Sequence, residues 1–346
     1  MQIDALPSPY VAGLFALGSA VICAAILGFL LKTRLAWWLA TDIPNDRSLH
    51  TRPTPRVGGW GVVPVVLAVI ALFAQSLWLI AVCSFFLAAV SQLDDRRGLP
   101  ARVRFGAHVL AVVLVVAAYA ASVPWWALAI IAFLMVWLVN LYNFMDGADG
   151  LAGGMALFGF GGYAVVALGA AQPIPELAWA SAAVAGAAVG FLIFNFHPAK
   201  IFLGDAGSIT IGFLAGAFGY WGWHGHAWPI WFPAMVFAPF IGDASVTLAK
   251  RLLRGEKFWQ AHRDHYYQRM VRLGIGHART ARLWYATMLA GIIIAVWACY
   301  RSVAIQWGAV GVWAATLILA GAAVDRQWHR FQATHSRQTE VDADAS

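Results

Sequence analysis

Long apolar stretches, separated by short polar segments, run along almost the whole chain. Eleven of them lie at residues 9–31, 60–77, 78–93, 105–121, 125–142, 151–171, 177–195, 208–223, 229–249, 283–300 and 303–323. A helix crosses a bilayer with roughly 20 apolar residues, and these stretches are continuous rather than alternating as in barrel strands. Lipid offers no partners to backbone N–H and C=O groups, so a spanning segment must satisfy them internally. The pattern therefore predicts an all-α integral membrane protein.

The number of spans depends on residues 60–93, which form either one long helix or a hairpin broken near Gln75 and Ser76. The flanking segments 32–58 and 94–104 are both rich in Lys and Arg, and such loops stay in the cytoplasm. Two flanks on the same side require an even number of spans between them, so two are expected. This gives eleven transmembrane helices, with ten as the alternative, and an N-terminus outside.

Composition and charge agree with this topology. The chain of 346 residues is 61% hydrophobic and 11% charged, whereas a soluble domain carries about 25% charged residues. Every Lys and Arg except Arg301 falls in the predicted cytoplasmic segments 32–58, 94–104, 143–150, 196–207 and 250–282 or after residue 324. The net charge of +7 is thus explained by orientation in the membrane, and nucleic-acid binding is not expected.

The domain organisation follows from the same pattern. No internal repeat and no soluble domain are visible, so we expect one polytopic membrane domain over residues 1–325 and a polar, disordered tail over 326–346. The apolar stretch from Val11 to Leu31 precedes Lys32 and Arg34, which indicates a retained first helix rather than a cleaved signal peptide. The three cysteines lie in apolar stretches without disulfide or metal spacing.

Two polar motifs occupy the first two predicted cytoplasmic loops. Arg47, His50 and Arg56 lie in a proline-containing loop and are donors suited to phosphate oxygens, although a basic loop can also rest on anionic lipid. Asp94 and Asp95 are adjacent at the end of a predicted helix, where the helix dipole favours cations instead. Their placement indicates a function, such as a base or a metal ligand, unless the neighbouring arginines simply pair with them.

A third motif runs from Asn140 to Gly154 and is the most informative. Asp146 and Asp149 are three residues apart and share a face if the segment is helical. Asn140 and Asn143 add amide oxygens and donors, and the glycines permit close approach of a ligand to the backbone. An Asp at a helix start is often only a cap, but capping does not require two Asn and two Asp together.

A fourth motif, from Phe202 to Ser208, opens a predicted helix with Gly204, Asp205, Gly207 and Ser208. Helix N-termini with glycine bind phosphate through free N–H groups, and an Asp there is a plausible Mg²⁺ ligand because Mg²⁺ prefers oxygen. An ordinary helix cap is the alternative.

A fifth motif, in the longest basic loop, contains His262, Arg263 and His265. Together these side chains can neutralise a diphosphate. Zinc is the alternative ligand, but no cysteine lies nearby. The five motifs converge on one membrane face with acidic oxygens, glycine turns and cationic donors, which is the equipment of phosphoryl transfer.

In order from Asp42 to Arg269, the five segments resemble those of the polyprenyl-phosphate N-acetylhexosamine-1-phosphate transferases. That superfamily also contains phospho-N-acetylmuramoyl-pentapeptide transferase. The resemblance implies ten or eleven spans in the bacterial inner membrane, with the active site facing the cytoplasm. It also implies transfer of a sugar 1-phosphate from a UDP-N-acetylhexosamine to undecaprenyl phosphate, with release of UMP. Mg²⁺ is the implied cofactor, with Mn²⁺ as the alternative.

The resemblance further implies residue roles. Asp205 matches the metal-binding aspartate, and Asn143 matches an asparagine near the metal and the diphosphate. Asp146 and Asp149 match carboxylates that line the nucleotide-sugar pocket.

For the chemical step, Asp94 matches the carboxylate proposed to deprotonate the lipid phosphate, and Asp95 supports it or the metal. The lipid phosphate is expected to attack the β-phosphorus while His262, Arg263 and His265 stabilise the developing charge. A covalent aspartyl intermediate is the alternative route.

The histidine segment reads His-Arg-Asp-His-Tyr-Tyr, without the three successive histidines of the muramoyl-pentapeptide enzymes. It is more similar to the branch that starts O-antigen and related surface polysaccharides of the cell wall and lipopolysaccharide, so peptidoglycan synthesis is the alternative. Helices rich in Gly and Ala also leave room for a homodimer.

Two other classes of protein were weighed. A transporter would need intramembrane acids, and Asp243 is the candidate, although a pairing with Lys250 or Arg251 explains it as well. A lipid phosphatase would use Arg and His without the paired Asp. Neither class accounts for acids clustered at one membrane face.

Overall fold

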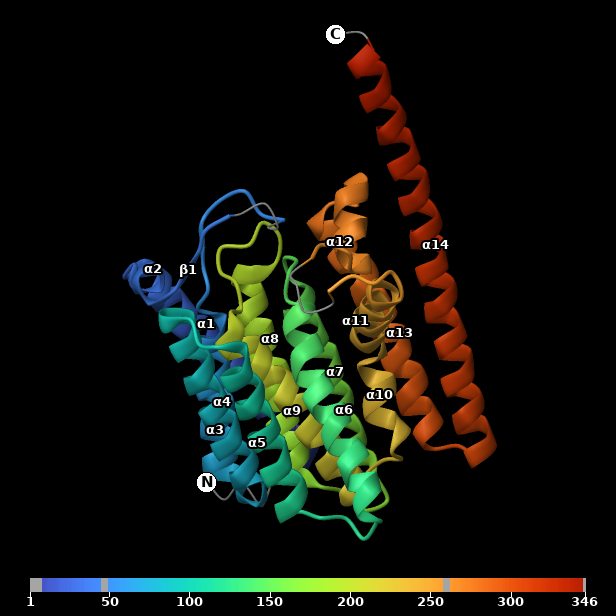
Figure 1. Cartoon of the computed structure of the whole chain (residues 1–346). Coiled ribbons are helices and arrows are strands. Elements are labelled where there is room, and N and C mark those ends of the chain that lie inside the picture. Colours follow the sequence, from blue (N-terminus) through green and yellow to red (C-terminus); the bar gives the residue numbers. More distant parts are fainter. Residues whose placement is uncertain (1–7, 45–48, 258–261, 345–346) are drawn as a thin grey trace.

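Eighteen helices and short strands make up the part of the chain that the computed structural model describes, residues 8–44, 49–257 and 262–344. The elements are α1 (Ser8–Lys32), α2 (Leu35–Leu39), β1 (Thr41–Asp42), β2 (Thr54–Pro55), α3 (Gly58–Phe73), η2 (Gln75–Leu77), α4 (Trp78–Arg97), α5 (Ala101–Ala118), α6 (Trp125–Phe144), α7 (Leu151–Gly169), α8 (Pro175–Asn195), α9 (Asp205–His224), α10 (Trp231–Val236), α11 (Ala238–Leu253), α12 (Tyr266–Met270), η3 (Val271–Ile275), α13 (His277–Cys299) and α14 (Val303–Asp344). The long helices run side by side and form a bundle (Figure 1).

The predicted fold class is confirmed. Eight helices within the described ranges are long and apolar enough to cross a membrane, and α3 is a shorter apolar helix. The residues 60–93 are a hairpin of two helices, broken at Gln75–Leu77 as expected. The predicted ninth span is two helices, α10 and α11, which part at Phe237. Pro239 follows that break, and a proline cannot continue a helix that precedes it.

The C-terminal segment differs from its prediction. Residues 326–344 continue α14 as a helix, although a disordered tail over 326–346 was expected. The segment contains neither glycine nor proline after Gly321, so nothing in its local chemistry ends the helix. Trp328 is also buried, with only 6% of its surface exposed, so the first turn of the extension packs against the bundle.

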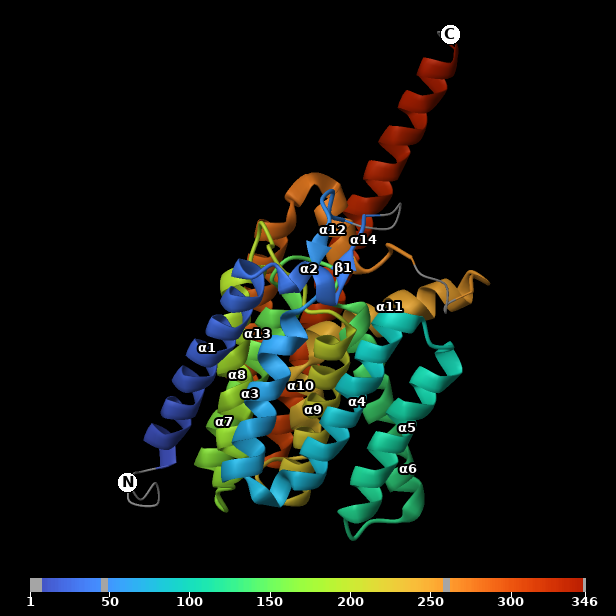
Figure 2. The same cartoon turned by 90° about the vertical axis from the view of Figure 1, so that its left-hand side faces the viewer.

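The middle of the bundle is α9, which packs against α3, α4 and α6 and is buried along nearly its whole length. The neighbouring α8 packs along both α1 and α7 (Figure 2). Close approach of α1 and α8 depends on Gly186, where a Cβ would lie 1.9 Å from the carbonyl oxygen of Ala16. Small residues at such contacts are how membrane helices pack.

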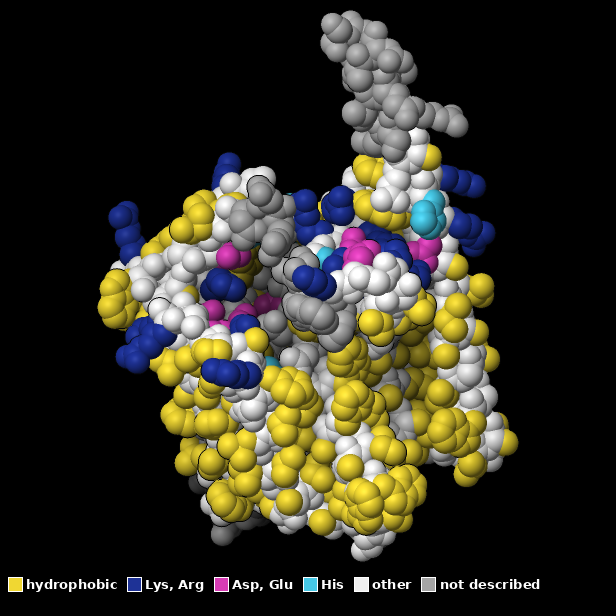
Figure 3. Space-filling model, in the orientation of Figure 1, with side chains coloured by type: hydrophobic (Ala, Val, Ile, Leu, Met, Phe, Trp, Pro, Cys, Tyr) yellow, Lys and Arg dark blue, Asp and Glu magenta, His cyan; other side chains and the backbone are white. Residues whose placement is uncertain are grey.

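Charged side chains gather at one end of the bundle, above a wide hydrophobic belt (Figure 3). We call this the charged end; it comprises residues 39–44, 49–57, 94–104, 143–150, 196–207, 250–257 and 262–276 together with α14 beyond Asp325. The N-terminus lies at the opposite end of the bundle from the C-terminus (Figure 1). This arrangement agrees with an odd number of spans.

Candidate functional site

A cleft of about 260 Å³ opens at the charged end. Segments far apart in the sequence line it: Asp42, Leu49, His50, Arg56, Asn143, Asp146, Gly147, Ala148, Asp149, Asn195, Phe202, Gly204, Asp205, Gln268 and His277. Figure 3 shows acidic and basic side chains side by side in the hollow at this end. Four of the five sequence motifs contribute to the lining, and the Asp94-Asp95 pair does not.

Backbone hydrogen bonds hold two of these segments together. Phe202 N donates to Pro55 O at 2.8 Å, and Gly58 N donates to Phe202 O at 2.9 Å. Gly204 has a φ of 74°, and a Cβ there would lie 3.0 Å from Arg56 O. The loop before α3 therefore lies against the turn before α9, which places Arg56 beside Asp205.

The Arg56 guanidinium is surrounded by carboxylates. It lies 3.8 Å from Asp95 Oδ1 and 3.9 Å from Asp205 Oδ1. Burial lowers the pKa of Arg56, but the carboxylates of Asp205, Asp95, Asp42 and Asp146 outweigh that effect and raise it. One cation thus faces four acids, and this excess of negative charge favours binding of a further cation.

Asp146 is buried next to Asp205, which favours its protonated form when no cation is bound. Burial raises the pKa of the Asp146 carboxyl well above its usual range, and the nearby Asp205 carboxylate raises it further, while Arg56 acts in the opposite direction. A bound cation would stabilise the charged form of Asp146 and displace its proton.

Asp205 is the first residue of α9, where the positive end of the helix dipole favours an acid. Asn143 Nδ2 donates to Asp205 Oδ1 at 3.2 Å and to Ser208 Oγ at 2.9 Å. Asn143 therefore fixes the end of α6 to the first turn of α9. The sequence placed these three residues in one site, and the structure brings them together.

Asp149 belongs to a second group within the cleft. His197 Nδ1 lies 2.6 Å from Asp149 Oδ2, and His277 Nδ1 lies 3.7 Å from Asp149 Oδ1. The two imidazole rings stack with centroids 5.3 Å apart. Ligand atoms of the three side chains lie within 4.8 Å of one another. Hydrogen bonds already occupy several of these atoms: His197 Nδ1 bonds with Asp149 Oδ2, and His277 Nε2 lies 3.3 Å from Leu49 O.

The Asp94-Asp95 pair divides as its position on a helix suggests, because adjacent side chains point about 100° apart. Asp94 accepts hydrogen bonds from Leu99 N at 2.6 Å and from Arg104 at 2.8 Å, and so closes the turn between α4 and α5. Asp95 instead faces Arg56. The structure therefore brings Asp95 to the carboxylate cluster and keeps Asp94, the expected base, in contact with Arg104.

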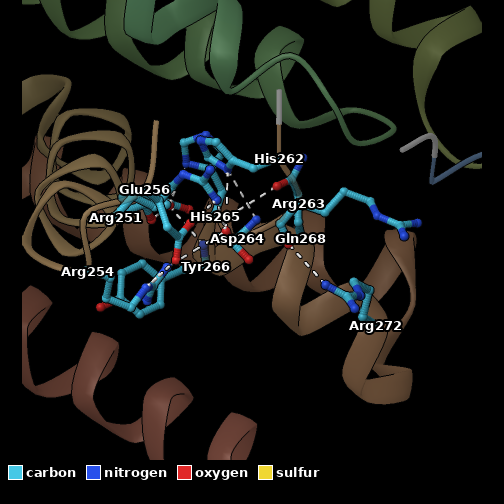
Figure 4. Close-up of polar contacts among 12 residues, drawn as sticks. Arg251, Arg254, Glu256, His262, Arg263, Asp264, His265, Tyr266, Gln268 and Arg272 are labelled. Carbon is cyan, nitrogen blue, oxygen red and sulfur yellow. Dashed lines mark hydrogen bonds and ion pairs between the residues drawn. The ribbon is translucent and has the colours of Figure 1, made fainter. Parts of the chain in front are cut away.

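The two histidines of the fifth motif do not line the cleft, and Figure 4 shows their rings together with Asp264 and Arg251. His262, Arg263 and His265 are not among the lining residues, whereas Gln268 of the same segment is. His265 is buried, and the Arg263 side chain extends away from the two histidine rings. Burial lowers the pKa of His262 to about 4, helped by His265 and Arg251. His262 is therefore neutral at pH 7, which does not suit the cationic role expected from the sequence.

Asp243 is a structural residue of this region. Its carboxylate accepts hydrogen bonds from the amides of Tyr266 and Tyr267 at 2.9 and 3.0 Å and lies 3.2 Å from His265 Nδ1. Its partner is thus the start of α12, whereas the sequence suggests Lys250 or Arg251. Because these bonds engage it fully, Asp243 offers no support for a transport pathway.

The other predicted site residues have mixed positions. His50 lies in the lining, 3.5 Å from Asp42 Oδ2. Gly207 packs against Gly59 of α3, and Asn140 donates to Val136 O within α6. Arg47 lies outside the described residues.

Sequence reasoning missed four lining or flanking residues: Asp42, His197, Gln268 and His277. Asp42 and Gln268 lie within the first and the fifth motif but were not singled out there, whereas His197 and His277 are single polar residues outside all five motifs.

The residues of the cleft fit a divalent metal ion of the Mg²⁺ type. Asp205, Asp146 and Asp95 supply carboxylate oxygens, and their charge exceeds what Arg56 can balance. Mg²⁺ is bound through one or two carboxylates together with substrate phosphates. Asp205 and Asp146 line the cleft, whereas Asp95 reaches the cluster through Arg56.

Comparisons with known proteins identify relatives that match most of the chain. A family model described as glycosyl transferase family 4 matches residues 77–222. The chain is 30% identical over 304 residues to a decaprenyl-phosphate N-acetylglucosaminephosphotransferase of Mycolicibacterium smegmatis, covering 73% of each chain. It is 29% identical over 287 residues to a probable undecaprenyl-phosphate N-acetylglucosaminyl 1-phosphate transferase of Bacillus subtilis, covering 78% of this chain and 79% of that one.

A shorter match joins the chain to the peptidoglycan branch. It is 43% identical over 93 residues to a phospho-N-acetylmuramoyl-pentapeptide-transferase of Oceanobacillus iheyensis, covering 26% of this chain and 28% of that one. With the helical fold, the shared motifs and the matches across most of its length, this multi-pass membrane protein belongs to the superfamily of polyprenyl-phosphate N-acetylhexosamine-1-phosphate transferases.

Proposed function

We propose that the protein transfers N-acetylglucosamine 1-phosphate, or a closely related N-acetylhexosamine 1-phosphate, from its UDP-sugar to undecaprenyl phosphate and releases UMP. The observation that carries this proposal is the cluster of four carboxylates around Arg56, three of which, those of Asp42, Asp146 and Asp205, line the cleft at the charged end. Such a cluster binds a divalent cation, and a cation with a diphosphate is the core of phosphoryl transfer. The relatives that match most of the chain are named for transfer of N-acetylglucosamine phosphate.

The location and pathway are part of the proposal. The charged end faces the cytoplasm of a bacterial inner membrane, because basic segments stay on that side. The soluble donor then enters from the cytoplasm and the lipid acceptor from the bilayer. The departure of the histidine segment from three successive histidines supports initiation of a surface polysaccharide such as O-antigen. Peptidoglycan synthesis is the weaker candidate, because the muramoyl relatives match only about a quarter of the chain.

Asp205 and Asp146 would hold Mg²⁺, or Mn²⁺ in its place, and the ion would supply positive charge that neutralises the diphosphate. Asn143 holds the Asp205 carboxylate in position, and Arg56 is available to a phosphate oxygen when the cation takes over part of its carboxylates. An oxygen of the lipid phosphate forms a bond to the β-phosphorus as the bond from that phosphorus to the UMP oxygen breaks. A covalent aspartyl-phosphate is the alternative route.

The lipid phosphate needs little help from a base, because a phosphate monoester loses its second proton near pH 6. This agrees with an Asp94 that closes the α4–α5 turn. Of the two acids, Asp95 is the one that contacts Arg56, and Arg56 in turn reaches the reacting phosphate groups.

The test is Asp205→Asn, assayed in membranes with radiolabelled UDP-N-acetylglucosamine and undecaprenyl phosphate at limiting Mg²⁺. We expect transfer to fall by about 100-fold or more, the usual cost of removing a group that stabilises transition-state charge. Glu176→Gln is the matched control, because Glu176 contacts Ser76 at the opposite end of the bundle. Transfer by Asp205→Asn at the wild-type rate would overturn the metal assignment.

A further inference from the structure

The end of α14 that reaches beyond the bundle contacts α12, the short helix whose Gln268 lines the cleft. Asp325 of α14 accepts hydrogen bonds from Arg269 at 3.0 Å, from Tyr266 Oη at 3.1 Å and from Lys250. Trp328, one turn further on, is buried under Arg269 and Arg272, with the guanidinium of Arg272 4.7 Å from its ring centroid. The two α14 residues thus contact α12 and η3 along one side.

The opposite side of α12 is fixed by α11 and α6. Asp243 of α11 accepts the Tyr266 and Tyr267 amides. Tyr267 Oη donates to Phe144 O at 3.1 Å, and a Cβ at Gly147 would lie only 2.2 Å from that hydroxyl. Tyr267 therefore sits directly on the loop that carries Asp146 and Asp149.

We propose that the cytoplasmic end of α14 is a clamp that holds α12 against the donor cleft, with Asp325 as its main positioning residue. The inference rests on the proposed function. Asp325 touches neither the cleft nor the reacting atoms. It acts through Arg269 and Tyr266, which flank Tyr267, a contact of the loop after α6, and Gln268, which lines the cleft. Removal of its carboxylate leaves two cations, Lys250 and Arg269, without their shared partner, and loss of one member of a partly buried pair is costly.

The first test measures kinetics by UMP release with Asp325→Asn. We expect KM for the UDP-sugar to rise by about tenfold, since displacement of binding groups that lie far from the chemistry still weakens productive binding. KM for the lipid acceptor should stay near its wild-type value. Asp325→Glu keeps the carboxylate and should restore most of the donor affinity. Arg326→Gln is the matched control, because Arg326 is exposed and its one hydrogen bond among the described residues is to Ala322 O within α14.

The second test does not depend on activity. Hydrogen exchange in the protein without substrate should become faster in Asp325→Asn, but not in Arg326→Gln, at the amides of residues 265–270. Exchange in α7 and α8 should not change. Trp328→Ala should act in the same direction, and Trp328→Phe should act less because an aromatic ring remains under the arginines.

Three results would overturn the clamp. The first is a KM for the UDP-sugar that is the same in Asp325→Asn and Arg326→Gln, and the second is unchanged hydrogen exchange at residues 265–270 in Asp325→Asn. The third is faster exchange across the whole bundle of Asp325→Asn together with a lower kcat and an unchanged KM. The wild-type protein could prove inactive while Asp325→Asn still speeds hydrogen exchange at residues 265–270. That result would overturn the proposed function and the clamp's link to catalysis. It would leave the contact of α14 with α12 established.

Discussion

Arg56 lies 3.8 Å from Asp95 Oδ1 and 3.9 Å from Asp205 Oδ1, distances at which a guanidinium attracts both carboxylates without a close hydrogen bond to either. Asp42 and Asp146 add further negative charge nearby. A single cation placed among four acids limits their mutual repulsion only in part. The geometry is therefore suited to a second, exchangeable cation that arrives with its phosphate ligand.

Substitution Arg56→Gln tests this balance of charge. We expect a loss of about 1–2 kcal/mol in stability without divalent cations, between the values for exposed and for buried ion pairs. Added Mg²⁺ should raise the stability of the variant by more than it raises the stability of the wild type. Thermal unfolding in detergent, with EDTA or with Mg²⁺, measures both. The control is Arg301→Gln at the other end of the bundle, and a deficit that Mg²⁺ does not reduce would contradict the account.

The depressed pKa of His262, about 4, predicts a response to acid. Between pH 6.5 and pH 4 the unfolded chain binds a proton at this histidine that the folded chain does not, so its contribution to stability falls as pH falls. His262→Gln removes that contribution. As pH falls from 6.5 to 4, we expect the thermal midpoint of the wild type to decrease more than that of the variant. A difference that is constant from pH 7.5 to pH 4.5 would contradict a buried, neutral His262.

At the scale of elements, the site depends on the contact of the loop before α3 with the turn before α9. Gly204 adopts a left-handed conformation and leaves 3.0 Å between its missing Cβ and Arg56 O. The backbone bonds from Phe202 to Pro55 and from Gly58 to Phe202 complete the contact. The position of Arg56 is thus set by the backbone and does not depend on its own side chain.

Gly204→Ala should therefore damage both stability and activity. An L-residue at a φ of 74° and a ψ of 165°, a region that is essentially restricted to glycine, costs about 1–3 kcal/mol, and a displaced Arg56 should lower transfer by about tenfold or more. Gly242→Ala is a matched control in α11, where a Cβ meets nothing within 4 Å. Thermal unfolding and UMP release are the measurements. If both variants behave like the wild type, Arg56 is positioned by something other than this contact.

Elements were predictable from the sequence where the apolar pattern alone determines them. The break at Gln75 followed from charge on both flanks, and the hairpin of α3 and α4 confirms it. The helical tail after Asp325 was not predictable from polarity, because its stability comes from Trp328 packing under Arg269 and Arg272. Likewise, local sequence could not show that Asp94 caps a turn while Asp95 faces Arg56, since that depends on where α5 and the loop before α3 lie.

The candidate site was predictable in its chemistry and less so in its membership. Asp205, Asn143 and Ser208 belong to dense motifs and meet as expected. His277 and Gln268 reach the cleft only because α12 and α13 fold back over the loop after α6. Such tertiary placement leaves no periodicity or spacing in the sequence.

At the scale of the whole molecule, eleven spans place the two termini on opposite sides of the membrane. Arg301 lies between α13 and α14, at the end away from the cleft, and Arg326 lies beyond the bundle at the charged end. In intact cells, a membrane-impermeant maleimide should label Arg301→Cys and should label Arg326→Cys only after lysis. The parent protein supplies the background, because Cys23 and Cys83 are buried and Cys299 is half-buried. The reverse labelling pattern would invert the topology and move the cleft outside.

The measurement that bears most directly on the central claim is product formation by the purified protein given UDP-N-acetylglucosamine, undecaprenyl phosphate and Mg²⁺. The cluster of carboxylates around Arg56 predicts that UMP and the lipid-diphosphate sugar form in equal amounts and that neither forms in EDTA. Other UDP-N-acetylhexosamines tested side by side would rank the donor sugars. No UMP from any of these donors, or sustained UMP release without lipid-linked product, would contradict transfer of a sugar phosphate at this site.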